Sequence, residues 1–256
     1  MGIFAKTFGS MHNLTIILLS ALIVASSYDL GQFPASVIAA LITVVALEAL
    51  FFKFYKRHRV KIPYSGIITA LIIGSVVPQN AVLVAIAASA IAVGSIFFIR
   101  SRNGNIFNPA TFGMFVSLGV LSVGDAWWGS TASLGMYGFA VPFAIILGLA
   151  AYEARRLTAS FTFILASLAI GAIFAGNFTL SGIVAALVGI NFYFAFIMLA
   201  EPKTSPHIPM QQAAYGAGVA VLYYLLATSR LGYPFLFALL LGNLAYAAYR
   251  RRQRLA

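Results

Sequence analysis

Residues 34–61 read PASVIAALITVVALEALFFKFYKRHRVK. The first part is an apolar run about as long as the roughly 20 residues that an α-helix needs to cross a bilayer. The last nine residues carry five Lys and Arg side chains. A long apolar segment followed by a basic one is typical of a membrane span whose end faces the cytoplasm. We therefore expect a spanning helix over residues 34–53 with a cytoplasmic loop after it.

The composition extends this expectation to all 256 residues. Apolar residues make up 62% of the chain and charged residues 8%, whereas a soluble domain has roughly 45–50% and about 25%. A single globule of this size cannot bury so much apolar surface, and a disordered chain has the opposite balance. The absence of cysteine excludes disulfides, thiolate metal sites and a cysteine nucleophile. We expect an all-α polytopic membrane protein.

Apolar runs between charged and turn residues predict ten membrane-spanning helices. They lie at about 12–28, 34–53, 63–78, 81–99, 107–123, 136–152, 157–175, 178–200, 211–229 and 234–249. Little chain remains between them, so we expect a single membrane domain over residues 1–256. Ten spans divide into halves of five, residues 1–133 and 134–256. An odd number of spans per half inverts the second half in the bilayer, as in many transporters.

The placement of the positive charges tests this count. With the N-terminus inside, 15 of the 16 Lys and Arg residues lie in the cytoplasm and only Arg230 lies outside. The cytoplasmic set is Lys6, Lys53, Lys56, Arg57, Arg59, Lys61, Arg100, Arg102, Arg155, Arg156, Lys203, Arg250, Arg251, Arg252 and Arg254. We expect both termini in the cytoplasm. Anionic lipid of the inner leaflet then explains the net charge of +11 without nucleic acid.

Two polar segments interrupt the apolar pattern on the cytoplasmic side. Residues 102–113 (RNGNIFNPATFG) link the fourth and fifth spans. Because Pro109 disfavours the helical region for the residue before it, we expect Asn108 to be extended or to cap the next helix. Residues 200–206 (AEPKTSP) close the eighth span. Taken alone, they indicate a helix stop with an exposed Glu201–Lys203 pair, which contributes little energy.

Two further polar features lie elsewhere in the spans. The predicted outside loop 125–135 (DAWWGSTASLG) has two Trp residues typical of a membrane interface and small hydroxyl residues that a modifying enzyme could reach. Glu48 lies inside the second span, where a carboxylate could relay protons or bind a cation. The alternative, which we favour, is that Glu48 lies near the interface, paired with Lys53 or reaching toward water. The three His residues have no spacing that indicates a metal site.

Several of these segments, in order, resemble the RnfD/NqrB family, the membrane flavoprotein subunits of the Rnf and Na⁺-translocating NADH:quinone oxidoreductase complexes. The first half contributes SGIITAL at 65–71 with Pro78, followed by NIFNPA at 105–110. The second half contributes FIMLAEPKTSP at 196–206, YG at 215–216, GYP at 232–234, FA at 237–238 and GNL at 242–244. The resemblance covers roughly residues 62–135 and 181–250.

The resemblance implies a subunit that carries FMN and moves electrons across the cell membrane, assisted by a flavin transferase and by other subunits of an Rnf/Nqr-like complex. In the family, a threonine in an outside loop carries FMN through a phosphoester bond. Asp125, Gly129 and Thr131 match the spacing of that loop, whereas Trp128 and Ser130 depart from it. Ser130 and Ser133 are the alternative acceptors.

The resemblance also implies a second, non-covalent flavin nearer the cytoplasmic side. Its neighbours would be Asn105, Asn108 and the turn from Glu201 to Thr204. We expect these cytoplasmic segments to converge on one central cavity, because polar groups without partners are costly in lipid. The family's fold is akin to urea and ammonium channels, so a solute channel or transporter without flavin is the alternative function.

Overall fold

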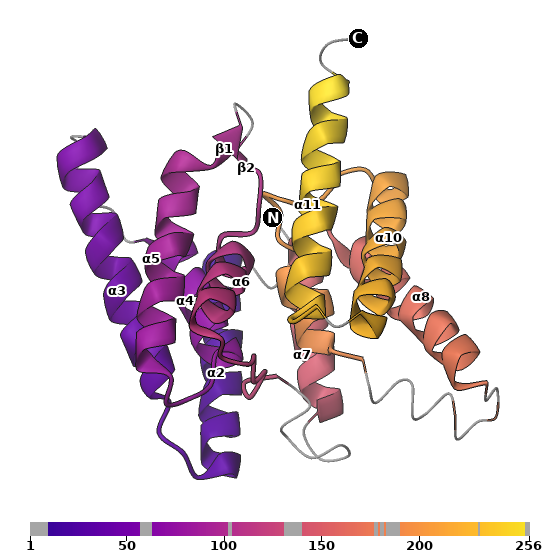
Figure 1. The fold of residues 1–256 in the computed structure, drawn as a ribbon, viewed down its shortest axis with the longest axis horizontal. Coiled ribbons are helices and arrows are strands. Elements are labelled where there is room, and N and C mark those ends of the chain that lie inside the picture. Colours follow the sequence, from indigo (N-terminus) through magenta and orange to yellow (C-terminus); the bar gives the residue numbers. More distant parts are fainter. Residues whose placement is uncertain are drawn as a thin grey trace. The chain divides into compact units, whose positions relative to one another are not determined.

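The computed structural model describes residues 10–56, 63–101, 104–130, 140–176, 179, 182, 190–229 and 231–253. The described residues are mostly helical, and the chain divides into two compact units, Met1–Ser133 and Leu134–Ala256 (Figure 1). Each unit is taken by itself below.

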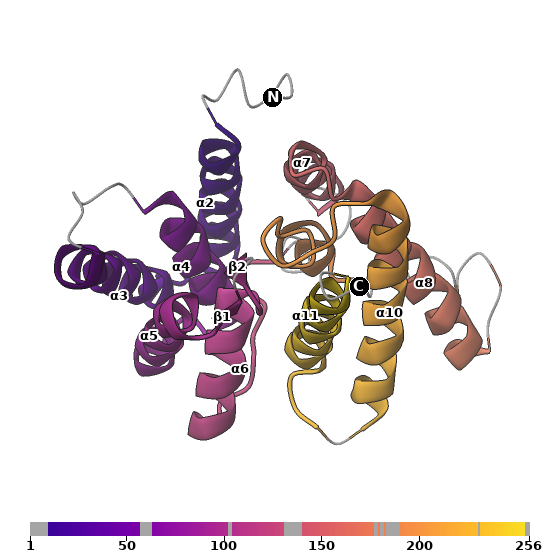
Figure 2. The same ribbon diagram turned by 90° about the horizontal axis from the view of Figure 1, so that it is seen from above.

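Unit 1 consists of packed helices with one short hairpin. Its elements are α2 (Met11–Leu30), α3 (Ala35–Phe51) with the π-helical turn η1 (Phe52–Lys56), α4 (Tyr64–Val76), α5 (Val82–Phe98), β1 (Arg100–Ser101), β2 (Gly104–Asn105) and α6 (Pro109–Leu121). The two strands pair antiparallel, with Arg100 opposite Asn105. Helix α3 packs against α4 and α5, α5 packs against α6, and α2 packs against α4 (Figure 2).

Unit 2 is built around α10. Its described elements are α7 (Ala140–Glu153), α8 (Leu157–Ala175), the π-helical turn η4 (Phe194–Met198), α10 (Pro209–Thr228) and α11 (Pro234–Arg252). Helix α10 packs against both α8 and α11, while η4 contacts α7 and α8 (Figure 2). Residues 178, 180, 181 and 183–189 of the predicted span 178–200 lie outside the described residues, and η4 is near the end of this span.

Three segments of the described chain are long and apolar enough to cross a membrane: Met11–Leu30, Ala35–Phe54 and Leu157–Phe174. Shorter apolar helices accompany them, and the chain is therefore a helical protein of the membrane-embedded type. Where a predicted span is described, its helix starts and ends within a few residues of the expected range.

Two helices of unit 1 are shorter than predicted. Helices α4 and α6 have 13 residues each, which is about 20 Å at 1.5 Å per residue, less than the roughly 30 Å of a bilayer core. Helix α4 ends because Val77 precedes Pro78 and adopts an extended conformation (ψ 145°). Val77 and Gln79 are nevertheless buried, 0% and 6% exposed. Irregular backbone is tolerated inside membrane proteins where protein surrounds it.

Candidate functional site

The loop that follows α6 folds back onto the C-terminal end of α4. The last carbonyl groups of a helix have no partner within the helix, and this loop supplies partners for those of α4. Trp128 Nε1 donates to the carbonyls of Gly74 and Val77, at 2.9 Å each. Three backbone amides of the loop also donate to α4: Gly129 to the Ser75 carbonyl at 2.9 Å, and Ala126 and Trp127 to the Val76 carbonyl at 2.8 and 3.1 Å. The loop is thus held by segments about 50 residues away in the sequence.

Side-chain contacts also fix this loop. Trp127 Nε1 donates to Asp125 Oδ2 at 2.6 Å, and Trp127 has a positive φ of 48°, which is an uncommon and strained conformation for a bulky residue. Gly129 lies so close to α4 that a Cβ atom there would be 2.5 Å from Ser75 Cβ. Only glycine therefore fits at position 129.

The predicted flavin ligands of this loop differ in accessibility. Asp125 is partly exposed, whereas Trp128 and Ser130 are buried, 6% and 3% exposed. The expectation that both Trp residues form an interfacial belt is thus wrong for Trp128, whose ring nitrogen caps α4. Ser130 is equally unavailable as a surface acceptor. Thr131 and Ser133 lie outside the described residues.

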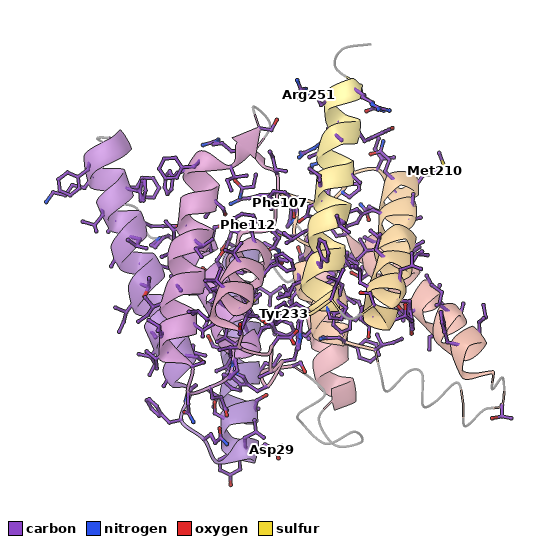
Figure 3. All side chains as sticks on the ribbon, viewed as in Figure 1. Asp29, Phe107, Phe112, Met210, Tyr233 and Arg251 are labelled. Carbon is purple, nitrogen blue, oxygen red and sulfur yellow. The ribbon has the colours of Figure 1, made fainter. Side chains whose placement is uncertain are left out.

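The Asn-containing segment before α6 caps that helix. Asn108 is extended (φ −60°, ψ 119°), and its Oδ1 accepts from the Thr111 amide at 3.1 Å, which confirms the predicted N-cap. Asn105 and Asn108 are buried, 8% and 2% exposed. The rings of Phe107 and Phe112 stack at 5.4 Å between centroids (Figure 3). Asn108 precedes α6 and Asp125 follows it, so these two candidate residues lie at opposite ends of the helix.

In unit 2, the predicted Glu201–Pro206 turn is a compact hydrogen-bonded structure. The Glu201 carbonyl accepts from Ser205 Oγ at 2.6 Å and from the Ser205 amide at 3.1 Å. Thr204 Oγ1 donates to Glu201 Oε2 at 3.3 Å. Lys203 is exposed but Glu201 is only partly exposed, so the expectation of an exposed pair is wrong for Glu201, although the Lys203 charge acts on its carboxyl group. Asn105 and Asn108 belong to unit 1 and this turn belongs to unit 2, so their predicted convergence stays a prediction.

Two further side chains complete the polar cluster around this turn. Asn243 on α11 is 0% exposed, and its Nδ2 donates to Tyr215 OH at 2.7 Å and to the Thr204 carbonyl at 3.4 Å. Asn243 and Tyr215 were not predicted as site residues, although both lie in segments that resemble the family. An amide inside the last apolar span was the one sequence signal that could have identified Asn243.

Burial raises the pKa of Glu201 to about 7, while Lys203 and the Thr204 hydrogen bond act in the opposite direction. The folded protein then binds a proton that the unfolded chain releases near its ordinary value of 4.5. The contribution of Glu201 to stability is therefore greatest below about pH 4.5, falls as the pH rises from about 4.5 to about 7, and levels off above that range. We expect Glu201→Gln to remove this dependence and to stabilise the protein at pH 8 by on the order of 2 kcal/mol.

Thermal midpoints of the detergent-purified protein at pH 5 and pH 8 test this prediction. Lys203→Gln provides the opposing control: losing the cation raises the Glu201 pKa further, so the decline from pH 5 to pH 8 should become steeper. Equal slopes in wild type and Glu201→Gln would show that the carboxyl group does not titrate in this range.

Glu48 is buried rather than exposed at the interface. It is 7% exposed on α3, and a Cβ atom at Gly66 of α4 would lie 2.7 Å from its Oε1. Lys53 instead lies over the Phe54 ring, 5.4 Å from the centroid. The favoured expectation of a carboxylate that reaches toward Lys53 is therefore wrong, and Glu48 belongs to the contact between α3 and α4.

The chain is a helical protein of the membrane-embedded type. Each of its two units contains buried polar side chains. No protein-family model and no curated protein matches the sequence. The function must therefore be argued from the motifs and from their geometry.

Proposed function

We propose that the chain is an RnfD/NqrB-like membrane subunit that carries FMN and moves electrons across the cell membrane. The observation that carries this proposal is that segments with the family resemblance pack on one another in each unit. In unit 1, the 125–130 loop binds the end of α4, which bears the SGIITAL sequence. This loop lies immediately before Thr131 in the sequence, which is the acceptor that the resemblance implies.

Three motif segments of the second half support the same proposal. Asn243 of the GNL segment donates to Tyr215 of the YG segment and to Thr204 of the turn segment. Gly242 lies against the same tyrosine, because a Cβ atom there would be 3.3 Å from Tyr215 Cε2. Three motif segments that are far apart in the sequence are thus in contact. Such contacts are expected if the motifs together specify one fold.

We further propose that the two units are inverted five-helix repeats of a ten-span protein. Corresponding helices pack against each other in both units. In unit 1 the pairs are α3 with α5, α5 with α6, and α2 with α4; the corresponding pairs in unit 2 are α8 with α10, α10 with α11, and α7 with η4. One hydrogen bond also recurs. Ser36 Oγ near the start of α3 donates to the Gly74 carbonyl at 2.9 Å, and Ser160 Oγ near the start of α8 donates to Ala195 at 2.7 Å.

In this proposal the protein supplies attachment, orientation and electrostatics, while the flavin supplies the redox chemistry. Thr131 carries FMN on the outer side, with Asp125 and Gly129 shaping its loop. Trp128 holds the loop to α4 and Ser130 is buried, so neither is proposed to contact the flavin. Asn105, Asn108 and the Glu201–Thr204 turn are the proposed neighbours of a second flavin. A flavin transferase and other subunits of an Rnf/Nqr-like complex are the proposed partners.

The colour of the protein tests this function most simply. Protein produced together with a flavin transferase is expected to be yellow, and flavin fluorescence should stay with the chain after denaturation and gel electrophoresis. Colour that is lost on denaturation would leave only non-covalent flavin. Colourless protein from the same cells would contradict the proposal.

The short helices α4 and α6 favour a second candidate function. Helices that stop within the membrane and continue as buried irregular chain are typical of transporters and channels. A solute channel would be colourless and would accelerate solute flux in liposomes, whereas an electron-transfer subunit would not.

The topology can be tested because the chain has no cysteine. Asp29 and Arg251 lie at ends of α2 and α11 (Figure 3), and both are exposed. With the N-terminus inside, we expect an impermeant maleimide to label Asp29→Cys in intact cells. Arg251→Cys should react only after permeabilisation. Labelling of both positions from the same side would contradict the proposed span count.

A further inference from the structure

Three basic side chains meet at one end of unit 2, where α8 and α10 begin and α11 ends. Arg156 is 3% exposed, and its guanidinium contacts His207 Nδ1. Arg250 lies over the Tyr246 ring, 4.7 Å from the centroid. Burial lowers the pKa of His207, and the charges of Arg156 and Arg250 lower it further. The charges of Arg156 and Arg250 therefore act on a neutral His207, and we call these three residues the basic cluster.

Within the part of the chain that the structure describes, no carboxylate accepts a hydrogen bond from the Arg156 guanidinium or from Arg250 Nε. The acceptors of the Arg156 guanidinium other than His207 are all neutral: Ser205 Oγ (2.9 Å) and the carbonyls of Pro202 (3.3 Å), Ala154 (3.2 Å) and Arg155 (3.1 Å). Glu201 accepts from Thr204 instead. Arg250 Nε is buried and has no hydrogen-bond partner. Buried charge without a counter-ion is costly, so an anion would stabilise this end of the unit.

The start of α10 adds to the positive field of the basic cluster. Ile208 precedes this helix and gives it no side-chain cap, and its first turn has no acidic residue. The N-terminus of a 20-residue helix carries a partial positive charge. Gln211 Nε2 donates to Tyr249 OH at 3.3 Å, which ties this end of α10 to the end of α11. Figure 3 shows Met210 and Arg251 at this same end of the unit.

We propose that the basic cluster binds a phosphate group, carried by the headgroup of an anionic phospholipid. Arg250 supplies the charge and the unused Nε donor. Because His207 Nδ1 accepts from Arg156, the His207 proton resides on Nε2, which donates to a second phosphate oxygen. Arg156 is a positioning residue that holds the imidazole and the turn. The inference does not depend on flavin.

Native mass spectrometry of the delipidated full chain in detergent tests the proposal, with dioleoyl phosphatidylglycerol and dioleoyl phosphatidylcholine as probes. We expect phosphatidylglycerol to bind more tightly. Arg250→Gln should weaken its binding about tenfold, the value of one hydrogen bond to a charged group. The matched control is Arg251→Gln, which removes the same charge one residue further along from an exposed position, and should change binding less than twofold.

Each result decides for or against the site. Equal losses in the two Arg variants, or equal binding of the two lipids, would show a general basic surface and overturn the proposal. Competition by millimolar inorganic phosphate would support phosphate recognition and identify free phosphate as a second source, whereas its failure would assign the site to lipid alone. If Arg250→Gln lowers the thermal midpoint, His207→Gln is the second variant, and an unchanged affinity there would also overturn the proposal.

Discussion

Thr131→Ala is expected to abolish covalent flavin completely. The substitution removes the hydroxyl that would form the phosphoester bond, and no other residue matches that position of the family loop. The fold should be unaffected, because the loss of one loop hydroxyl usually costs little stability. In-gel flavin fluorescence of protein produced with a flavin transferase measures the first effect, and the thermal midpoint measures the second.

Two neighbouring variants serve as controls for Thr131→Ala. Thr131→Ser keeps an acceptor hydroxyl and should retain part of the label. Ser130→Ala should retain all of it, because Ser130 is buried. Label that persists in Thr131→Ala but disappears in Ser130→Ala would move the attachment point and contradict the assignment.

Gly216→Ala is expected to be the most destabilising of the small substitutions in unit 2. A Cβ atom at Gly216 of α10 would overlap the Ala159 carbonyl oxygen and Thr162 Oγ1 of α8. Neither atom can move freely, since Thr162 Oγ1 donates to the Thr158 carbonyl at 2.7 Å. Overpacking of this kind typically costs about 1–3 kcal/mol, which lowers the thermal midpoint of a protein of this size by roughly 2–10 °C.

Gly218→Ala on the same helix is the matched control. No atom lies within 4 Å of a Cβ placed there, and alanine favours helix over glycine by about 1 kcal/mol. This variant should raise the midpoint by a few degrees while Gly216→Ala lowers it. Equal shifts in the two variants would mean that α8 and α10 do not pack as closely as described.

The local features were predictable because they depend on neighbouring residues. The extended Asn108 cap follows from Pro109, and the helix positions follow from apolar runs between turn residues. Helix α4 ends two residues before its predicted end, because the prediction followed the apolar run and did not apply to Val77 and Pro78 the rule that it applied to Asn108 and Pro109. The carbonyl groups at this end of α4 accept hydrogen bonds from the loop after α6, which the sequence of α4 alone does not indicate.

The long-range features could not be read from local patterns. Trp128 has the sequence setting of an interfacial residue, but its partners are more than 50 residues away. Residues 155 and 156 are both arginine and are adjacent in the sequence, yet Arg155 is exposed and Arg156 is buried. The difference arises because residues 202–207 pack against the start of α8, where Pro202, Ser205 and His207 contact the Arg156 guanidinium. Charge counting therefore gave a topology but could not identify a structural guanidinium.

The central claim is that this chain carries FMN on the loop after α6. The most direct measurement is the mass of the peptide spanning residues 125–135, from wild-type protein produced with a flavin transferase that is active on a known acceptor in the same cells. The account predicts an increase equal to one FMN moiety, localised to Thr131 by fragmentation. An unmodified peptide beside a fully labelled reference acceptor would contradict it.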